Sequence, residues 1–293
     1  MRNLLLKLAY SNVWIALQAG GQAIMTQVML DLPLDPRAPW LCFLSMLFVY
    51  TFAKTVRFDP TADALNDPDR TAFLLRWRAP LIAAGVLGFG LGAWQAHRWQ
   101  VLWLYLFPVL TAVFYDIKFL PATFRYRRLK DITGVKSVVV AVAWSVLGTL
   151  LPVSLSGQGF SAGVAFLLVW HFAMFFVNTV YFDLGDMRGD RAEGTLTLPL
   201  WLGFEATRAL LLAITLACAA GLWLAARSGL VGPEGHYVNL LTLYQLAFVG
   251  AARDESTDLG FLCDVVADGA FLVGGVLALL GRVAYSATIF SAS

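Results

Sequence analysis

Long apolar runs separated by shorter polar segments extend along the whole chain. A helix that crosses the hydrocarbon core of a bilayer needs about 20 mostly apolar residues. Runs near this length predict transmembrane helices over residues 8–30, 38–56, 79–96, 99–115, 135–155, 160–182, 207–226, 237–251 and 260–281. The pattern therefore predicts an all-α fold, a polytopic membrane bundle of about nine transmembrane helices around a central cavity. No linker divides the chain, so we expect residues 1–293 to form one membrane-embedded domain.

The composition agrees with a protein embedded in a membrane. Hydrophobic residues make up 59% of the chain and charged residues only 14%, whereas soluble domains carry about 25% charged residues. The first apolar run lacks a convincing signal-cleavage site, so we expect it to be retained. The sequence has no basic stripe long enough to follow a phosphate backbone, and we expect no nucleic acid partner.

The polar segments predict the orientation of the bundle. Three long ones, over residues 57–78, 116–134 and 183–206, hold most of the lysines and arginines. Cytoplasmic loops of membrane proteins carry an excess of these residues. We therefore expect an integral, multi-pass protein whose N-terminus and three long loops are cytoplasmic.

Two clusters of carboxylates follow the ends of predicted spans. Asp59 and Asp63 lie four residues apart after the second span, and Asp183, Asp186 and Asp190 follow the sixth. In a helix, each cluster would face one side. Carboxylates crowded on one face repel each other, and Mg²⁺ binds one or two carboxylates together with substrate phosphates. The two clusters predict a site for two or three Mg²⁺ ions around a diphosphate.

Such a site suits the ionisation of an isoprenoid diphosphate. Metal ions and basic side chains stabilise the charge that develops on the diphosphate as the C–O bond breaks. The allylic carbocation that forms needs a dry pocket with aromatic faces. Aromatic residues make up 14% of the chain, which is enough to line one.

The carboxylate clusters resemble the signatures of the UbiA-like prenyltransferase superfamily. The first signature, N-x-x-x-D-x-x-x-D followed by a basic residue, corresponds to Thr55, Asp59 and Asp63 with Arg70 after them. Thr55 stands where the family usually has asparagine. That departure favours a divergent acceptor, a shifted chemistry or lost activity.

The second signature, D-x-x-D-x-x-x-D, is the more specific one. It corresponds to Asp183, Asp186 and Asp190, followed by Arg191 and by the sequence GTLTLP over residues 194–199. Leu196 stands where many members carry a basic residue, which is the second departure. The segment 128–136 looks like the family's loop between spans four and five, which commonly has a tyrosine at its start.

The resemblance implies a role for each of these positions. Asp59 and Asp63 would bind one Mg²⁺, and the three aspartates of the second signature would bind another. The substrate contacts that the resemblance implies are Thr55, Arg70, Tyr115, Lys130 and Arg191, with Lys118 and Lys136 as weaker candidates for the diphosphate. Asn178, which lies just before the second cluster, is a further candidate from its position alone. The expected partners are an isoprenoid diphosphate, a hydrophobic acceptor and membrane lipid.

Four functions remain open at this point. We favour transfer of a prenyl group to a lipophilic or aromatic acceptor. A membrane terpene cyclase would use the same metal cluster and quench the cation within the substrate. A carboxylate-lined ion transporter would place its acids near the bilayer midplane, whereas these lie at span ends. An inactive homologue is the fourth alternative.

Polar residues within the spans are harder to assign. Asn178 is as well suited to the site as to helix packing, and His171 is expected to make a hydrogen bond between helices. Asp264 and Asp268 lie four residues apart near the start of the last span. We expect them to cap that helix; the alternative is a base for the acceptor or the carbocation.

Overall fold

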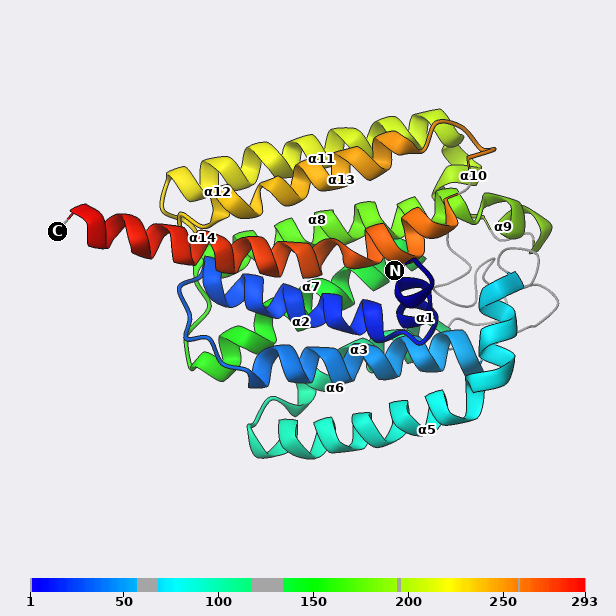
Figure 1. Ribbon diagram of the computed structural model, residues 1–293, viewed down its shortest axis with the longest axis horizontal. Helices are drawn as coiled ribbons and strands as arrows, with labels where there is room; N and C mark the ends of the chain where they lie inside the picture. Colours follow the sequence, from blue (N-terminus) through cyan, green and yellow to red (C-terminus); the bar gives the residue numbers. More distant parts are fainter. Residues whose placement is uncertain (1, 57–67, 117–133, 194–195, 258, 293) are drawn as a thin grey trace, which may run out of the picture.

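The computed structural model describes residues 2–56, 68–116, 134–193, 196–257 and 259–292. Within these residues the chain is helical and contains no strand. Helices run roughly along one direction and pack side by side into a bundle (Figure 1). The predicted all-α fold is confirmed.

Each predicted span coincides with helical structure. The helices that cover these spans are α2 (Val13–Met29), α3 (Arg37–Val56), α5 (Pro68–Arg98), α6 (Leu102–Asp116), α7 (Val135–Ser156), α8 (Ala162–Gly185), α11 (Phe204–Arg227), α13 (Leu240–Ala251) and α14 (Ala270–Ala292). Five helical stretches of the described chain are long and apolar enough to cross a membrane: Pro68–Arg98, Val135–Ser156, Ala162–Gly185, Phe204–Arg227 and Leu262–Ala287. A total of nine transmembrane helices stays a prediction.

The ends of several predicted spans differ from the structure, and the last helix, α14, extends to Ala292 instead of ending near residue 281. A short helix, α1 (Arg2–Tyr10), precedes α2, because Asn12 adopts a left-handed conformation with φ of 61° between them. Helix α12 (Gly235–Val238) ends just before α13 begins. Residues 68–78, expected in a polar loop, form the first turns of α5, with a proline at the start where a missing N–H costs nothing.

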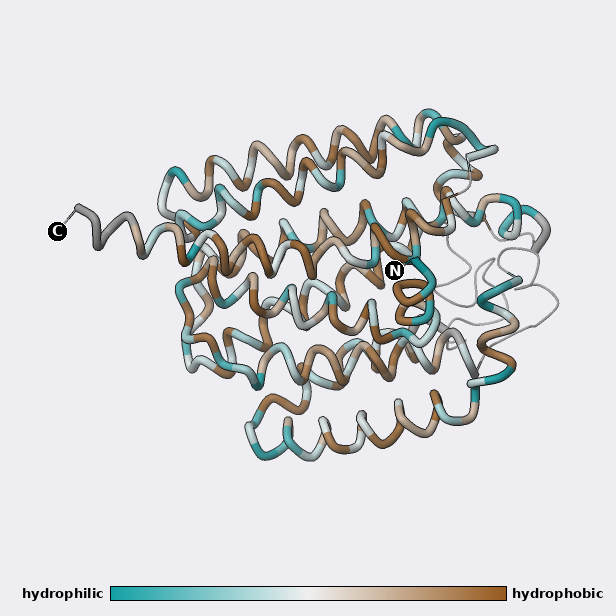
Figure 2. The backbone as a smooth tube through the Cα atoms, in the orientation of Figure 1, coloured by the Kyte–Doolittle hydropathy of each residue, from teal (hydrophilic) through white to brown (hydrophobic). Residues whose placement is uncertain are grey.

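Two further short helices lie at one end of the bundle. Helices α9 (Met187–Glu193) and α10 (Leu198–Leu202) connect α8 to α11, and they lie at the same end as the first turns of α5 (Figure 1). Hydrophilic residues concentrate at the two ends of the bundle, whereas hydrophobic residues predominate along the middle of the helices (Figure 2). This distribution is the one expected of a bundle that spans a bilayer.

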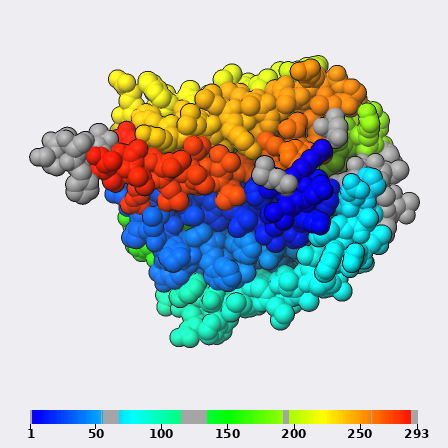
Figure 3. Space-filling view, viewed as in Figure 1, coloured from blue at the N-terminus to red at the C-terminus, as the bar shows by residue number. Residues whose placement is uncertain are grey.

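Large apolar side chains also cover the outside of the bundle. On α5, Val86, Leu87 and Trp94 are all exposed. A soluble protein rarely exposes a continuous apolar surface of this kind, so we assign it to contact with lipid tails. Helix α14 lies between α2 and the α11–α13 pair, as the space-filling view shows (Figure 3).

Glycine permits the close approach of α2 and α14. A Cβ atom added to Gly21 would lie 2.5 Å from the Phe271 carbonyl oxygen and 2.7 Å from the Leu272 Cα. Both contacts are with backbone, which cannot move without shifting the whole helix. Small residues at helix interfaces allow this kind of packing in membranes.

We therefore expect Gly21→Ala to lower the free energy of unfolding by about 1–3 kcal/mol, the usual cost of overpacking. Gly90→Ala is the matched control, because a Cβ there would meet nothing within 4 Å. Equilibrium unfolding in mixed detergent micelles measures both variants. Equal stability of the two variants would show that the helices can separate freely at Gly21.

Candidate functional site

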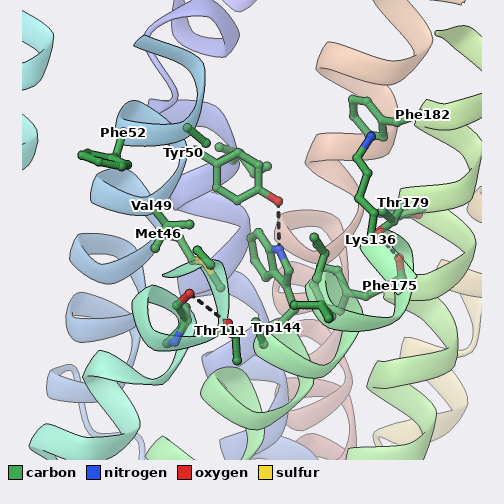
Figure 4. Close-up of a pocket in the computed structure, with 18 of the residues that line it drawn as sticks. Met46, Val49, Tyr50, Phe52, Thr111, Lys136, Trp144, Phe175, Thr179 and Phe182 are labelled. Atoms are coloured by element: carbon green, nitrogen blue, oxygen red, sulfur yellow. Dashed lines mark hydrogen bonds between the residues drawn. The ribbon is translucent and has the colours of Figure 1, made fainter. Parts of the chain in front are cut away.

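A cavity of about 530 Å³ opens inside the bundle. Its walls come from α2, α3, α6, α7 and α8, with Arg70 from α5, Asp186 just after α8 and Asp268 from the start of the last span. Most of the lining is apolar, and Figure 4 shows Met46, Val49, Phe175 and Phe182 among the side chains that surround the space. Among the described lining residues, Arg70, Lys136 and Asp186 lie at one end of the cavity, where α5 and α7 begin and α8 ends, and the fourth charged residue is Asp268.

Aromatic side chains hold the shape of the apolar part. Trp144 donates a hydrogen bond from its Nε1 atom to the Tyr50 hydroxyl at 3.0 Å (Figure 4). The Trp144 ring stacks on Phe175 with 4.5 Å between the centroids, and Phe175 stacks on Phe271 at 3.9 Å. These contacts fix the rings, so that their faces border a space with few polar groups.

The charged end is organised around Lys136 and Asp183. The Lys136 Nζ atom lies 3.0 Å from Asp183 Oδ1, and the Ser137 hydroxyl donates to Asp183 Oδ2, also at 3.0 Å. Asp183 is 2% exposed, so these two donors provide what a buried carboxylate requires. Lys136 itself lines the cavity and lies within electrostatic range of Asp186 and Asp190.

The three aspartates of the second signature do not share one continuous helix. Helix α8 ends at Gly185, Asp186 follows it, and Asp190 lies in α9. The expectation of a single helical face is therefore wrong. Asp186 lines the cavity, whereas Asp183 is turned toward Lys136 and Ser137.

The surroundings of Asp186 and Asp190 disfavour negative charge. Burial raises the pKa of Asp186, and the neighbouring acids Asp183 and Asp264 raise it further, against the opposing effect of Lys136 and Arg70. Burial, Asp183 and Asp186 raise the pKa of Asp190 to about 6, although Lys136 lowers it. Oxygen Oδ2 of Asp190 is buried without a hydrogen-bond partner among the described residues. A cation beside these carboxylates would stabilise their negative charge and would also give the buried Asp190 oxygen a partner.

Mg²⁺ fits this donor set if the two carboxylates supply only part of its coordination. No group of three histidine, cysteine or acidic side chains in the described ranges is arranged to hold a metal ion by itself. Mg²⁺ seldom requires such a cage, because it keeps several waters and binds one or two carboxylates plus substrate phosphates. Asp186 and Asp190 could supply these one or two carboxylate ligands.

Several predicted site residues cannot be placed. Asp59, Asp63, Lys118 and Lys130 lie outside the described residues, as does the side chain of Tyr115. Their roles stay predictions.

Other predicted residues are placed in or beside the cavity. Arg70 lines it and lies 3.8 Å from Asp264 (NH1 to Oδ1). Asn178 also lines it, while donating to the Ala267 carbonyl at 3.1 Å and accepting from Gln245 at 2.8 Å. Asn178 therefore contributes to packing and to the cavity wall at the same time.

Thr55 and Arg191 make contacts elsewhere. The buried Thr55 hydroxyl donates to the Thr51 carbonyl within α3. The Arg191 guanidinium is 60% exposed and lies 3.6 Å from the Glu255 carboxylate. Neither residue belongs to the cavity lining in this structure.

Sequence reasoning underrated two residues that border the cavity. Lys136 was only a weaker candidate for the diphosphate, and Asp268 was expected to cap a helix. His171 accords with its expected packing role, because its Nδ1 atom lies 2.8 Å from the Thr149 hydroxyl. Charge at the start of a span signals a residue near the membrane surface, but it does not indicate the direction in which the side chain points.

Comparison with known proteins identifies the family to which the chain belongs. A sequence model of the UbiA prenyltransferase family matches residues 75–262. The chain belongs to the UbiA prenyltransferase family. The resemblance inferred from the two signatures is thus confirmed. No curated protein matches the chain.

Solved UbiA homologues share the fold along nearly the whole chain. A UbiA homologue from Archaeoglobus fulgidus bound to GPP and Mg²⁺ aligns with a TM-score of 0.66 at 12% identity, covering 94% of this chain and 98% of that one. An apo UbiA homologue from Aeropyrum pernix K1 aligns with a TM-score of 0.60 at 14% identity, over 94% and 98% of the two chains. At such identities the likeness concerns the fold alone. The UbiA bundle is therefore a membrane fold that this chain shares.

Proposed function

We propose that this UbiA-family protein transfers a prenyl group from an isoprenoid diphosphate to a hydrophobic acceptor within the membrane, with Mg²⁺ as cofactor. The observation that carries the proposal is the cavity itself. One end presents Arg70, Lys136 and Asp186, and most of the remaining lining is apolar or aromatic. An isoprenoid diphosphate has the same division, with a highly charged head and a hydrocarbon tail.

The charged end would serve the departure of the diphosphate. Lys136 and Arg70 bring positive charge to the cavity wall, where they stabilise the negative charge that grows on the leaving group. Asp186 and Asp190 would hold Mg²⁺, together with Asp59 and Asp63 from the first signature. Bound Mg²⁺ supplies further neutralisation of the diphosphate oxygens.

The apolar part would serve the prenyl chain and the allylic cation. The fixed rings of Tyr50, Trp144 and Phe175 offer π faces, which attract positive charge. Few polar groups border this space, so little water is held there to capture the cation. The tail would pack against the same apolar walls.

The relatives support the choice of substrate class. Archaeoglobus fulgidus homologues have been solved with GPP and Mg²⁺ and with DMAPP and Mg²⁺. The charge distribution also favours this function over ion transport. Transport sites usually lie near the bilayer midplane on broken helices, whereas here Arg70, Lys136 and Asp186 lie together at one end of the cavity. We propose that this end faces the cytoplasm, in accord with the basic loops.

Diphosphate release tests the proposal directly. The protein, purified into lipid nanodiscs, is incubated with geranyl, farnesyl or geranylgeranyl diphosphate and Mg²⁺, with a membrane lipid extract as the acceptor source. We expect Mg²⁺-dependent release that EDTA abolishes. No release from any of the three substrates would refute the proposal. Cyclic hydrocarbons formed without an acceptor would instead identify a terpene cyclase.

A further inference from the structure

The last membrane-spanning segment begins with backbone that is not α-helical. Residues Leu262–Val266 form a π-helix and Ala267–Gly269 a 3₁₀ turn before α14 begins. Three consecutive carbonyls of this stretch accept hydrogen bonds from side chains of three other helices: Val265 from Trp14 Nε1 at 2.8 Å, Val266 from the Tyr244 hydroxyl at 2.8 Å and Ala267 from Asn178 Nδ2 at 3.1 Å. The distortion is therefore held in place by the bundle, and such π-helical turns are frequent at functional sites.

This stretch carries two buried carboxylates. Asp264 and Asp268 are each 6% exposed, in a segment that is otherwise apolar. Neither the π-helix nor the 3₁₀ turn has a side-chain cap, and a cap on α14 by either residue stays a prediction. Ionisable residues inside a membrane segment are costly and usually functional.

The two carboxylates have different surroundings. Asp264 lies beside Arg70, with 3.8 Å between Oδ1 and NH1. Asp268 lines the cavity and is within electrostatic range of the Tyr50 hydroxyl. Gln18, which also lines the cavity, fixes the next turn by accepting a hydrogen bond from the Phe271 N–H at 3.3 Å. Asp268 is thus placed by a fixed backbone on a wall that the aspartates of α8 and α9 do not form.

The chemistry of a carboxylate limits what Asp268 can bind. An ionised carboxylate accepts hydrogen bonds and donates none, and it repels a diphosphate. A hydroxyl group is the complement that a neutral, hydrophobic molecule in this cavity would offer to such an acceptor.

We infer that Asp268 is the acceptor-side catalytic residue, which binds the hydroxyl group of a hydroxylated acceptor and takes its proton. This inference rests on the proposed prenyl transfer. As the bond between C1 and the diphosphate oxygen breaks, its electron pair leaves with the diphosphate. The acceptor oxygen forms the new bond to C1, and its proton passes to the Asp268 carboxylate. The acceptor class is therefore an apolar alcohol or phenol.

Binding of two matched probes tests Asp268. The protein in nanodiscs is first saturated with Mg²⁺ and geranyl S-thiolodiphosphate, an analogue that resists ionisation. Isothermal titration calorimetry then compares 1-naphthol with 1-methoxynaphthalene, which cannot donate a hydrogen bond, with empty nanodiscs as the blank. We expect the wild type to bind 1-naphthol about tenfold more tightly, as a charge-assisted hydrogen bond provides. In Asp268→Asn the ratio should fall below about twofold.

Asp264→Asn is the matched control, because Asp264 lies in the same stretch and is as buried as Asp268 but does not line the cavity. It should keep the tenfold ratio. Equal binding of the two probes by the wild type, or an unchanged ratio in Asp268→Asn, would overturn the assignment. Affinity for the analogue reports separately on the proposed function. If the wild type fails to bind the analogue with Mg²⁺, prenyl transfer itself fails, whereas intact analogue binding confines the failure to Asp268.

Discussion

Asp186→Asn should reduce Mg²⁺-dependent diphosphate release by about 10²–10³-fold, the usual effect of removing one group that stabilises transition-state charge. Asp186 is the aspartate of the second signature that lines the cavity. Asparagine has nearly the same size, so the variant removes a negative charge without opening space. Loss of that charge weakens the attraction for the cation that the diphosphate needs.

Two measurements separate this effect from damage to the fold. The dependence of release on Mg²⁺ concentration should shift to higher concentrations in Asp186→Asn, while the unfolding midpoint should not fall, since burial and the neighbouring acids already disfavour charge there. Asp254→Asn serves as the control, because Asp254 is exposed and bonded to Ser256 in the loop after α13. It should release diphosphate within about twofold of the wild type. Full activity of Asp186→Asn would remove this residue from the metal site.

The helical bundle was predictable because a spanning helix needs apolar residues both where it contacts lipid and where it is buried, so each span appears in the sequence as a long apolar run. Each apolar run coincides with helical structure, but the apolar pattern did not show where a helix is broken or irregular. Asn12 is fully buried and breaks the first helix through its backbone conformation, which hydropathy does not encode. The irregular start of the last span depends on Trp14, Tyr244 and Asn178, which lie far away in the sequence.

The grouping of charged residues at the end of α8 was also predictable, but their individual contacts were less so. The spacing of Asp183, Asp186 and Asp190 identified the acidic end of α8. It did not show that Asp183 would turn toward Lys136 while Asp186 faces the cavity. Arg191 follows the signature directly, yet it lies beside Glu255. Helix direction and tertiary packing decide where a long side chain points, and sequence spacing does not contain either.

The pair formed by Lys136 and Asp183 predicts a second large effect. Lys136→Met removes one of the two cationic side chains that border the cavity in the described residues, and diphosphate release should fall by about 10²–10³-fold. It also leaves the Asp183 carboxylate, which is 2% exposed, without the Lys136 partner and with the Ser137 hydroxyl as a donor. A buried polar group that loses its partner costs about 1–3 kcal/mol. The variant should therefore be both inactive and less stable.

A second substitution separates the two losses. In the double variant Lys136→Met with Asp183→Asn, the buried side chain is neutral and can still bond to Ser137, so much of the stability should return. Activity should not return, because nothing replaces the positive charge that Lys136 brings to the cavity wall. Equilibrium unfolding in mixed detergent micelles and diphosphate release measure the two properties on the same samples. Lys7→Met, which removes an exposed charge from α1, should change neither property.

The alternative is that Lys136 has only a structural role, as the partner of a buried acid. In that case the double variant would regain diphosphate release together with stability, since its only defect would have been the uncompensated carboxylate. Lys136→Arg offers an independent check, because it keeps the charge while changing the geometry of the donor. Partial release by Lys136→Arg, with none by the restabilised double variant, would show that the positive charge acts on the substrate and that the ion pair with Asp183 serves to position it.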